Sequence, residues 1–198
     1  MKTTAVQERR YYNALDEYES GLKKVGWAVP RLLVKYLKPL LNGGELMLDV
    51  GCGPGFVGTE LKRASWQGKL IGVDIAERRL KESAAKSIYT SCAHANAYRL
   101  CFPSGTFDVV VSSAMVGLTG TSSVCEMWRV LKIGGILACV AGEFKKESWS
   151  RRRLRDSLRR FTQLPCASQL LRLDLGRGYL RDSCDNEHYV LAILRKTG

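Results

Sequence analysis

The chain has 198 residues, of which 31 are Lys or Arg and 19 are Asp or Glu, so its formal net charge is +12. Hydrophobic residues make up 45% and charged residues 25%, which is usual for a globular protein and excludes a chain that is disordered throughout. No apolar run approaches the roughly 20 residues of a membrane-spanning helix, and the first residues lack the apolar stretch of a secretory signal. We therefore expect one soluble, cytoplasmic domain over residues 1–198.

The cysteines favour the same compartment. Their number is odd, and no two have the spacing that is typical of zinc ligands. Several lie in apolar runs, so we expect buried, reduced thiols and no metal site. The seven positions are Cys52, Cys92, Cys101, Cys125, Cys139, Cys166 and Cys184.

Helical and strand-like patterns alternate along the chain. Residues 5–41 have apolar positions at helical spacing, and Pro30 is suited to a helix start. Periodicity and composition predict strands over 46–50, 69–74, 107–111, 136–141, 170–174 and 189–194. They predict intervening helices over 56–65, up to about residue 87, and over 124–132, the last ended by two glycines at 134 and 135. The segment from Ile88 to Pro103 has weak periodicity. The alternation indicates a doubly wound α/β fold with a mostly parallel sheet.

Positive charge is concentrated in the last quarter of the chain. Residues 145–198 hold 13 basic and 6 acidic side chains, a net +7, whereas residues 1–144 hold 18 and 13, a net +5. Leu154, Leu158 and Phe161 lie at helical spacing, which predicts a basic helix over 145–160 with a narrow apolar stripe. Its arginines either form a solvated face or attract an acidic partner.

A glycine-rich loop, Asp49 to Gly55 (DVGCGPG), follows the first predicted strand and precedes a helix. Glycines at this place let backbone N–H groups approach a ligand in the crevice of a doubly wound sheet. The segment Gly53 to Gly58 also fits the G-x-G-x-x-G dinucleotide pattern, and Asp74 could hold the ribose of either cofactor. Asp49 separates them, because a carboxylate repels a pyrophosphate but attracts the ammonium of S-adenosylmethionine. We therefore favour S-adenosylmethionine over a nicotinamide or flavin dinucleotide, or a turn without a ligand.

This loop resembles the first motif of the class I S-adenosylmethionine-dependent methyltransferases. The resemblance continues in order through residues 72–76 (GVDIA), 95–113 and 126–140, and covers about residues 46–142. A weaker similarity, carried by the N-terminal part, is to the Williams–Beuren-region methyltransferase-like group. The family implies a Rossmann-like sheet of seven strands. It divides the chain into a helical lid (1–41), a cofactor-binding core (46–142), and a basic helix with the last two strands (145–198).

The resemblance also implies which residues bind S-adenosylmethionine. Asp49 is expected to orient the amino acid end, Asp74 to accept the ribose hydroxyls and Ile75 to pack on the adenine. Asn96 stands where the family has an acidic residue, and either accepts from the adenine amino group or only forms a turn with its own backbone. The complete set is Asp49, Gly51, Cys52, Gly53, Gly55, Asp74, Ile75, Asn96, Ala97 and Ser112, the last through its carbonyl.

No catalytic residue can be assigned from the sequence. Tyr11 and Tyr18 lie on the lid and are candidates to contact cofactor or acceptor, unless both only pack the lid. His94 and His188 are better explained as structural residues. Positioning alone can supply about 7–11 kcal/mol of the barrier, so a carboxylate, thiolate or neutral amine acceptor needs no general base.

The acceptor is expected to be a small molecule that attacks the methyl group in line. The Asn-Pro-Pro-aromatic tetrapeptide of amino-directed nucleic-acid methyltransferases is absent, and we expect no additional substrate domain. One alternative is an RNA or protein acceptor that binds the 145–160 helix. Another is a cofactor-binding enzyme that does not methylate, such as a cyclase. We expect a monomer or homodimer without a membrane partner.

Overall fold

The computed structural model describes residues 5–24, 26–143, 155–156, 159–176 and 188–198. The helices are α1 (Ala5–Ala14), α2 (Tyr18–Lys24), α3 (Val29–Leu37), a 3₁₀ turn (Lys38–Leu40), α4 (Phe56–Arg63), α5 (Glu77–Ala85), α6 (Val116–Thr119) and α7 (Thr121–Val130). The strands are β1 (Leu46–Val50), β2 (Lys69–Asp74), β3 (Ser91–His94), β4 (Phe107–Ser113), β5 (Leu131–Glu143), β6 (Ala167–Gly176) and β7 (His188–Lys196).

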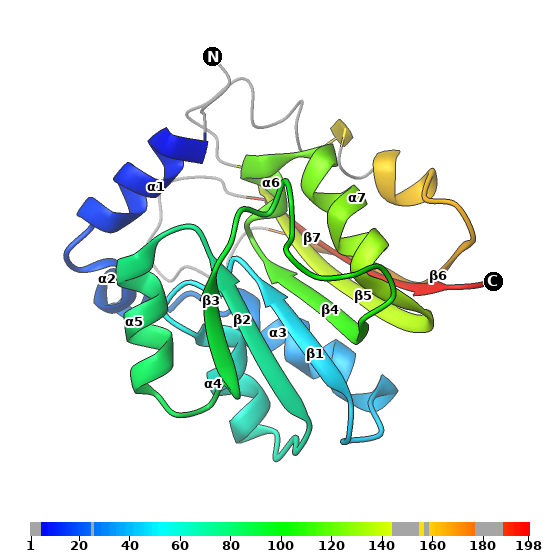
Figure 1. Ribbon diagram of the computed structural model, residues 1–198, viewed down its shortest axis with the longest axis horizontal. Helices are drawn as coiled ribbons and strands as arrows, with labels where there is room; N and C mark the ends of the chain where they lie inside the picture. The colour runs from blue at the N-terminus through cyan, green and yellow to red at the C-terminus, as the bar shows by residue number, and fades with distance from the viewer. Residues whose placement is uncertain (1–4, 25, 144–154, 157–158, 177–187) are drawn as a thin grey trace.

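The strands form a seven-stranded sheet in the order β3-β2-β1-β4-β5-β7-β6 (Figure 1). The five strands from β3 to β5 are parallel, and β7 runs antiparallel to both β5 and β6. The predicted doubly wound, mostly parallel α/β fold is therefore confirmed. The chain returns from the β3 edge to place β4 on the other side of β1. The carboxyl ends of β1, β2 and β4 therefore meet at the switch point where such sheets bind ligands.

The central strands are apolar because both of their faces are covered. Met47 packs in the cluster that contains α3 and α4, whereas its neighbour Leu48 packs in the cluster that contains α7. Val109 and Val110 in β4 alternate in the same way. Figure 1 shows α3 and α4 on one face of the sheet and α7 on the other. This layering holds the loops at the carboxyl ends of the strands in fixed positions.

One segment without a predicted element contains a strand, and one predicted helix ends early. The weakly periodic segment after Ile88 contains β3, a short strand that is defined by its parallel pairing with β2 rather than by an apolar run of its own. The helix predicted over 124–132 ends at Val130, because Leu131 is fully buried and extended and pairs with Phe107 of β4. Gly134 therefore lies inside β5 and does not end the helix.

The N-terminal region divides into parts with different packing. In α3 the helix begins with Pro30, and Leu33 and Leu37 are fully buried against the core. Neither α1 nor α2, both described over their whole length, contains a buried residue. Residues 5–24, shown in blue in Figure 1, are therefore the part of the predicted lid that does not join the core.

Most of the predicted basic helix lies outside the described residues. Residues 155–156 and 159–162 are helical, and Phe161 of the predicted apolar stripe is buried. Two nitrogens of the Arg160 guanidinium, Nη2 and Nε, lie 3.0 and 3.2 Å from the Cys125 sulfur. No helix in the described ranges is long and apolar enough to span a membrane.

The cysteines that the structure describes are free thiols, but they are not uniformly buried. Cys52 and Cys139 are buried, as expected. The expectation was wrong for Cys101 and Cys166, which are exposed because they lie in a loop and just before the edge strand β6. Cys184 lies outside the described residues.

Candidate functional site

The glycine loop joins β1 to α4 at the carboxyl edge of the parallel strands. Gly51, Gly53 and Gly55 have φ values of +73°, +52° and +87°, a region that residues with a side chain rarely adopt. The backbone N–H groups of Gly51 and Cys52 both donate to the Val73 carbonyl, at 2.8 and 3.0 Å. The loop is thus fastened to β2, and Gly55 is the N-cap of α4.

Asp74 ends β2 and holds the loop from the other side. Its Oδ2 accepts a hydrogen bond from the Gly53 N–H at 2.8 Å, and its Oδ1 accepts one from the Ala76 N–H at 2.8 Å. Burial raises the pKa of Asp74, and these backbone donors oppose that rise. Each carboxylate oxygen can accept a further hydrogen bond. The side chain can therefore fix the loop and bind a pair of hydroxyls at the same time.

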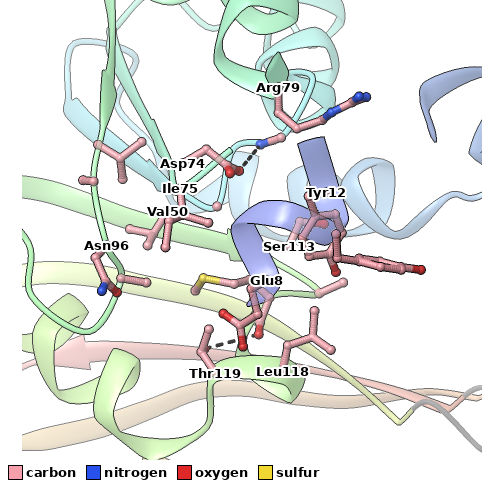
Figure 2. Close-up of a pocket in the computed structure, with 18 of the residues that line it drawn as sticks. Glu8, Tyr12, Val50, Asp74, Ile75, Arg79, Asn96, Ser113, Leu118 and Thr119 are labelled. Carbon is pink, nitrogen blue, oxygen red and sulfur yellow. Dashed lines mark hydrogen bonds between the residues drawn. The ribbon is translucent and has the colours of Figure 1, made fainter. Parts of the chain in front are cut away.

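A cavity of about 360 Å³ opens between the glycine loop and the helices α1 and α2 (Figure 2). Six of the predicted cofactor-binding residues line it: Gly51, Gly53, Asp74, Ile75, Asn96 and Ala97. Both lid tyrosines, Tyr11 and Tyr18, line it as well. The fold therefore brings together residues from the carboxyl ends of β1 and β2, from the segment after β3, and from the N-terminal helices.

Four predicted residues do not line the cavity. Asp49 is fully buried, and its Oδ2 accepts a hydrogen bond from the Tyr89 hydroxyl at 2.7 Å. Ser112 is also buried, and its hydroxyl donates to the Val50 carbonyl at 2.9 Å. Cys52 and Gly55 lie on the far side of the loop, next to Ser83. Their roles toward a cofactor stay predictions.

Asn96 performs the turn function that was one of its two expected roles. Its Oδ1 accepts from the Tyr98 N–H at 2.9 Å, and its carbonyl accepts from the Arg99 N–H at 2.9 Å. The residue nevertheless borders the cavity (Figure 2), so a contact with adenine stays a prediction. His94 does not line the cavity, and its Nε2 lies 3.0 Å from the Ile75 carbonyl.

The end of β4 supplies residues that the sequence did not identify. Ser113 lines the cavity, and its buried Oγ has no hydrogen-bond partner among the described residues. Ala114 has a left-handed φ of +65°, which directs the chain back over the loop. A Cβ atom at Gly51 would lie only 3.1 Å from the Met115 Cβ. Alternation along a strand places Ser112 and Ser113 on opposite faces, but only the packed sheet shows which of them faces the cavity.

Aromatic rings form much of the cavity wall under the lid. Tyr12 lies edge-on to Tyr11 and to Tyr18, with ring centroids 5.2 and 5.8 Å apart, and Trp27 and Tyr189 also line the cavity. Partial removal from water, although neither residue is fully buried, raises the pKa of Tyr18 to about 12 and raises the pKa of Tyr12 as well. Both phenols are therefore neutral near pH 7 and can donate hydrogen bonds, but cannot act as bases.

Comparison with known proteins supports the methyltransferase resemblance of the glycine loop. A family model described as a methyltransferase domain matches residues 48–139. An uncharacterized methyltransferase of Schizosaccharomyces pombe is 30% identical over 142 residues, which cover 65% of this chain and 50% of that protein. Residues 48–139 therefore form a methyltransferase domain of the class I, S-adenosylmethionine-dependent type. The chain spans about half the length of the first curated relatives that it matches.

Solved structures share the fold of this chain. Geranyl diphosphate C-methyltransferase from Streptomyces coelicolor, in complex with Mg²⁺, geranyl diphosphate and S-adenosyl-L-homocysteine, aligns over 100% of both chains with a TM-score of 0.71 and 14% identity. The [4+2]-cyclase SpnF aligns over 98% of this chain and 97% of its own, with a TM-score of 0.73 and 18% identity. At these identities the similarity concerns the fold alone.

The residues around the cavity fit S-adenosylmethionine, the cofactor of this domain family. The left-handed glycines bring backbone to the cavity wall, and Asp74 offers a carboxylate at the expected ribose position. Two buried oxygens, Asp49 Oδ1 and Ser113 Oγ, have no hydrogen-bond partner within the described part of the chain. Buried polar atoms without partners are unusual in folded proteins. A polar ligand in the cavity would satisfy the Ser113 oxygen, whereas Asp49 lies behind the cavity wall.

Polar contacts hold α1 and the segment that joins it to α2 against α5. The Asn13 side chain donates to Glu77 at 3.0 Å and accepts from the Arg78 N–H at 3.1 Å. Arg9 also pairs with Glu77, and these contacts lower the pKa of Glu77 to about 2, the Asn13 hydrogen bond being the largest cause. The buried Arg79 guanidinium donates to the Leu15 carbonyl at 2.7 Å. The α1–α2 region is thus attached directly to the helix that follows Asp74.

Replacing Asn13 with Ala is expected to loosen this attachment. The change removes two hydrogen bonds of about 1 kcal/mol each, so we expect S-adenosylhomocysteine to bind several-fold more weakly in calorimetry. Asp16→Ala is the matched control: it removes only the exposed ion pair with Arg78, which should contribute little. Equal affinities in the two variants would show that the Asn13 contacts do not hold the cofactor-binding conformation.

Proposed function

We propose that this chain transfers the methyl group of S-adenosylmethionine to a small molecule bound in the cavity beneath α1 and α2. The supporting observation is that two parts of this cavity have different linings. One part carries Gly51, Gly53 and Asp74, which are suited to the cofactor, and the lid covers the other with aromatic side chains. A cavity that is lined mainly by apolar and aromatic groups, with a few polar atoms, is typical of small-molecule sites.

The end of the cavity assigned to the acceptor favours a nucleophile without negative charge. Glu8, Ser113 and Leu118 line the cavity on the side away from Asn96 (Figure 2). Glu8 lies on the face of α1 that turns toward the protein, and its charge contributes to the raised pKa of Tyr12. A carboxylate or thiolate acceptor would be repelled by Glu8. Of the acceptors that need no general base, we favour a neutral amine.

When bound, S-adenosylmethionine would supply an activated methyl group to the amine lone pair, and the electrons of the broken C–S bond would remain on sulfur. The backbone at Gly51 and Gly53 and the carboxylate of Asp74 orient the donor, and the lid excludes water. Glu8 or solvent takes the proton that the methylated amine releases. Positioning of the two reactants supplies most of the rate enhancement.

The test is to incubate the protein with S-adenosylmethionine and a small-molecule cell extract. We expect S-adenosylhomocysteine to form together with a product heavier by one CH₂ unit, detected by untargeted mass spectrometry. Asp74→Ala protein is the control and should form neither compound. S-adenosylhomocysteine formed without any methylated product, or equal signals from both proteins, would contradict the proposal.

A nucleic-acid acceptor is the second candidate, because residues 145–160 are rich in arginine. Binding that depends on phosphate contacts weakens steeply with salt. Fluorescence anisotropy with a short RNA, measured at increasing salt concentration, separates the candidates. Our proposal predicts no binding even at low salt, whereas a steep salt-dependent affinity would favour RNA. A non-methylating cyclase would bind the cofactor and leave S-adenosylhomocysteine undetected.

A further inference from the structure

Tyr89 lies beneath the glycine loop, in the connection between α5 and β3. Three glycines leave room for its ring. A Cβ atom at Gly58 would lie 2.8 Å from the Tyr89 Cε2, one at Gly72 would lie 2.8 Å from Cδ1, and one at Gly55 would lie 3.0 Å from Cε2. The spacing of Gly55 and Gly58, which fits a dinucleotide pattern in the sequence, therefore accommodates a tyrosine ring from another part of the chain.

The Tyr89 hydroxyl connects two parts of the loop region. It donates to Asp49 Oδ2 at 2.7 Å and accepts from the Gly58 N–H of α4 at 3.3 Å. Burial raises the pKa of Tyr89 well above its usual value, so the phenol keeps its proton. The hydroxyl therefore holds one oxygen of the Asp49 carboxylate and, through Gly58, is fixed relative to α4.

The other oxygen of Asp49 is left unsatisfied. Oδ1 is buried and has no hydrogen-bond partner among the described residues, and leaving a buried acceptor unpaired costs about 1–3 kcal/mol. Asp49 is followed directly by Val50 and Gly51, both of which line the cavity. A cationic group bound in the cavity against Val50 and Gly51 would favour the charged form of the carboxylate behind them.

We infer that Tyr89 is a positioning residue for the amino acid end of the cofactor. Its hydroxyl fixes the rotation of the Asp49 carboxylate, so that the negative charge lies behind Val50 and Gly51 and attracts the ligand's ammonium from there. The inference rests on the proposed function, since it assumes that S-adenosylmethionine or its product occupies this cavity. Tyr89 itself does not line the cavity and acts only through Asp49 and the loop.

The test compares two ligands on Tyr89→Phe protein by calorimetry. Phe keeps the ring that packs against the glycines and removes both hydroxyl contacts. S-adenosylhomocysteine carries the ammonium, whereas 5′-methylthioadenosine keeps the adenosine and the sulfur but lacks the amino acid end. We expect S-adenosylhomocysteine to bind roughly 10- to 100-fold more weakly, the range of one hydrogen bond to a charged group. The affinity for 5′-methylthioadenosine should not change.

Further variants separate positioning from a structural role. Tyr36→Phe, which changes a tyrosine outside the cavity lining, should leave both affinities unchanged. Asp49→Asn should reproduce the selective loss, and adding Tyr89→Phe to it should weaken S-adenosylhomocysteine binding little further. This pair keeps the test valid if Tyr89→Phe alone folds poorly.

The remaining outcomes overturn the inference in distinguishable ways. An equal loss for both ligands would mean that the tyrosine only supports the loop, and no loss for either would mean that it has no role in binding. Failure of S-adenosylhomocysteine to bind the wild-type protein would reject the cofactor assignment, and the inference with it.

Discussion

Asp74→Ala is expected to lower the affinity for S-adenosylhomocysteine by on the order of 100- to 1,000-fold, the equivalent of two hydrogen bonds to a charged group. The carboxylate accepts from the Gly53 and Ala76 N–H groups and borders the cavity. The alanine variant removes the acceptor for the ribose hydroxyls. It also leaves the Gly53 and Ala76 N–H groups without their partner, so the loop that should contact the cofactor loses one of its anchors.

The measurement is calorimetry on folded protein, with circular dichroism to show that the sheet is intact. Asp74→Asn is the matched control: it keeps one acceptor oxygen in the same volume, so its affinity should fall between those of the wild type and the alanine variant. An unchanged affinity in Asp74→Ala would mean that the cofactor binds elsewhere, and the site assignment would be wrong.

As the pH rises, the unliganded Asp49→Asn variant is expected to become more stable relative to the wild type. Burial raises the pKa of Asp49 to about 7, and the hydrogen bond from Tyr89 opposes this rise. Because the pKa is higher in the folded than in the unfolded state, the folded state binds more protons between these two values. The stability that Asp49 contributes is therefore fully present below its unfolded pKa near 4 and is lost as the pH rises to about 7.

Urea denaturation of both proteins at about pH 4 and about pH 8 measures this effect. A shift of this size corresponds to roughly 3–4 kcal/mol of unfolding free energy, by which the variant should gain on the wild type between the two pH values. Asn keeps an oxygen that can accept from Tyr89, so packing is preserved. A pH-independent difference would mean that Asp49 ionises normally. In the wild type, the same titration predicts that S-adenosylhomocysteine binding releases a proton between about pH 5 and 7.

Sequence patterns predicted the elements whose residues carry the signal locally. The strands at residues 46–50 and 69–74 have the bounds expected of them, because an apolar run between a turn and a glycine loop is sufficient to specify a buried strand. The glycines of the loop and Asp74 could be identified for a similar reason. Their chemistry and order along the chain indicate a ligand-binding turn before any contact is known.

Other features were decided by the tertiary structure. The short strand β3 exists because β2 offers it a parallel partner, and Leu131 joins β5 because burial beside Phe107 outweighs continuation of α7. The residue patterns around β3 and Leu131 do not predict these strands by themselves, since the stabilising partners lie far away in the sequence.

The same distinction between sequence and tertiary structure applies to the functional site. The sequence by itself determined the cofactor class, through the glycines and the acidic residues at the ends of two strands. Only the tertiary structure decided that Ser113 rather than Ser112 faces the cavity and that Tyr89 fills the space beside Gly58 and Gly72. It also placed Asp49 behind the loop, bonded to that tyrosine. The physical reason is that a residue type carries chemistry, whereas burial and hydrogen-bond partners arise only when distant segments pack together.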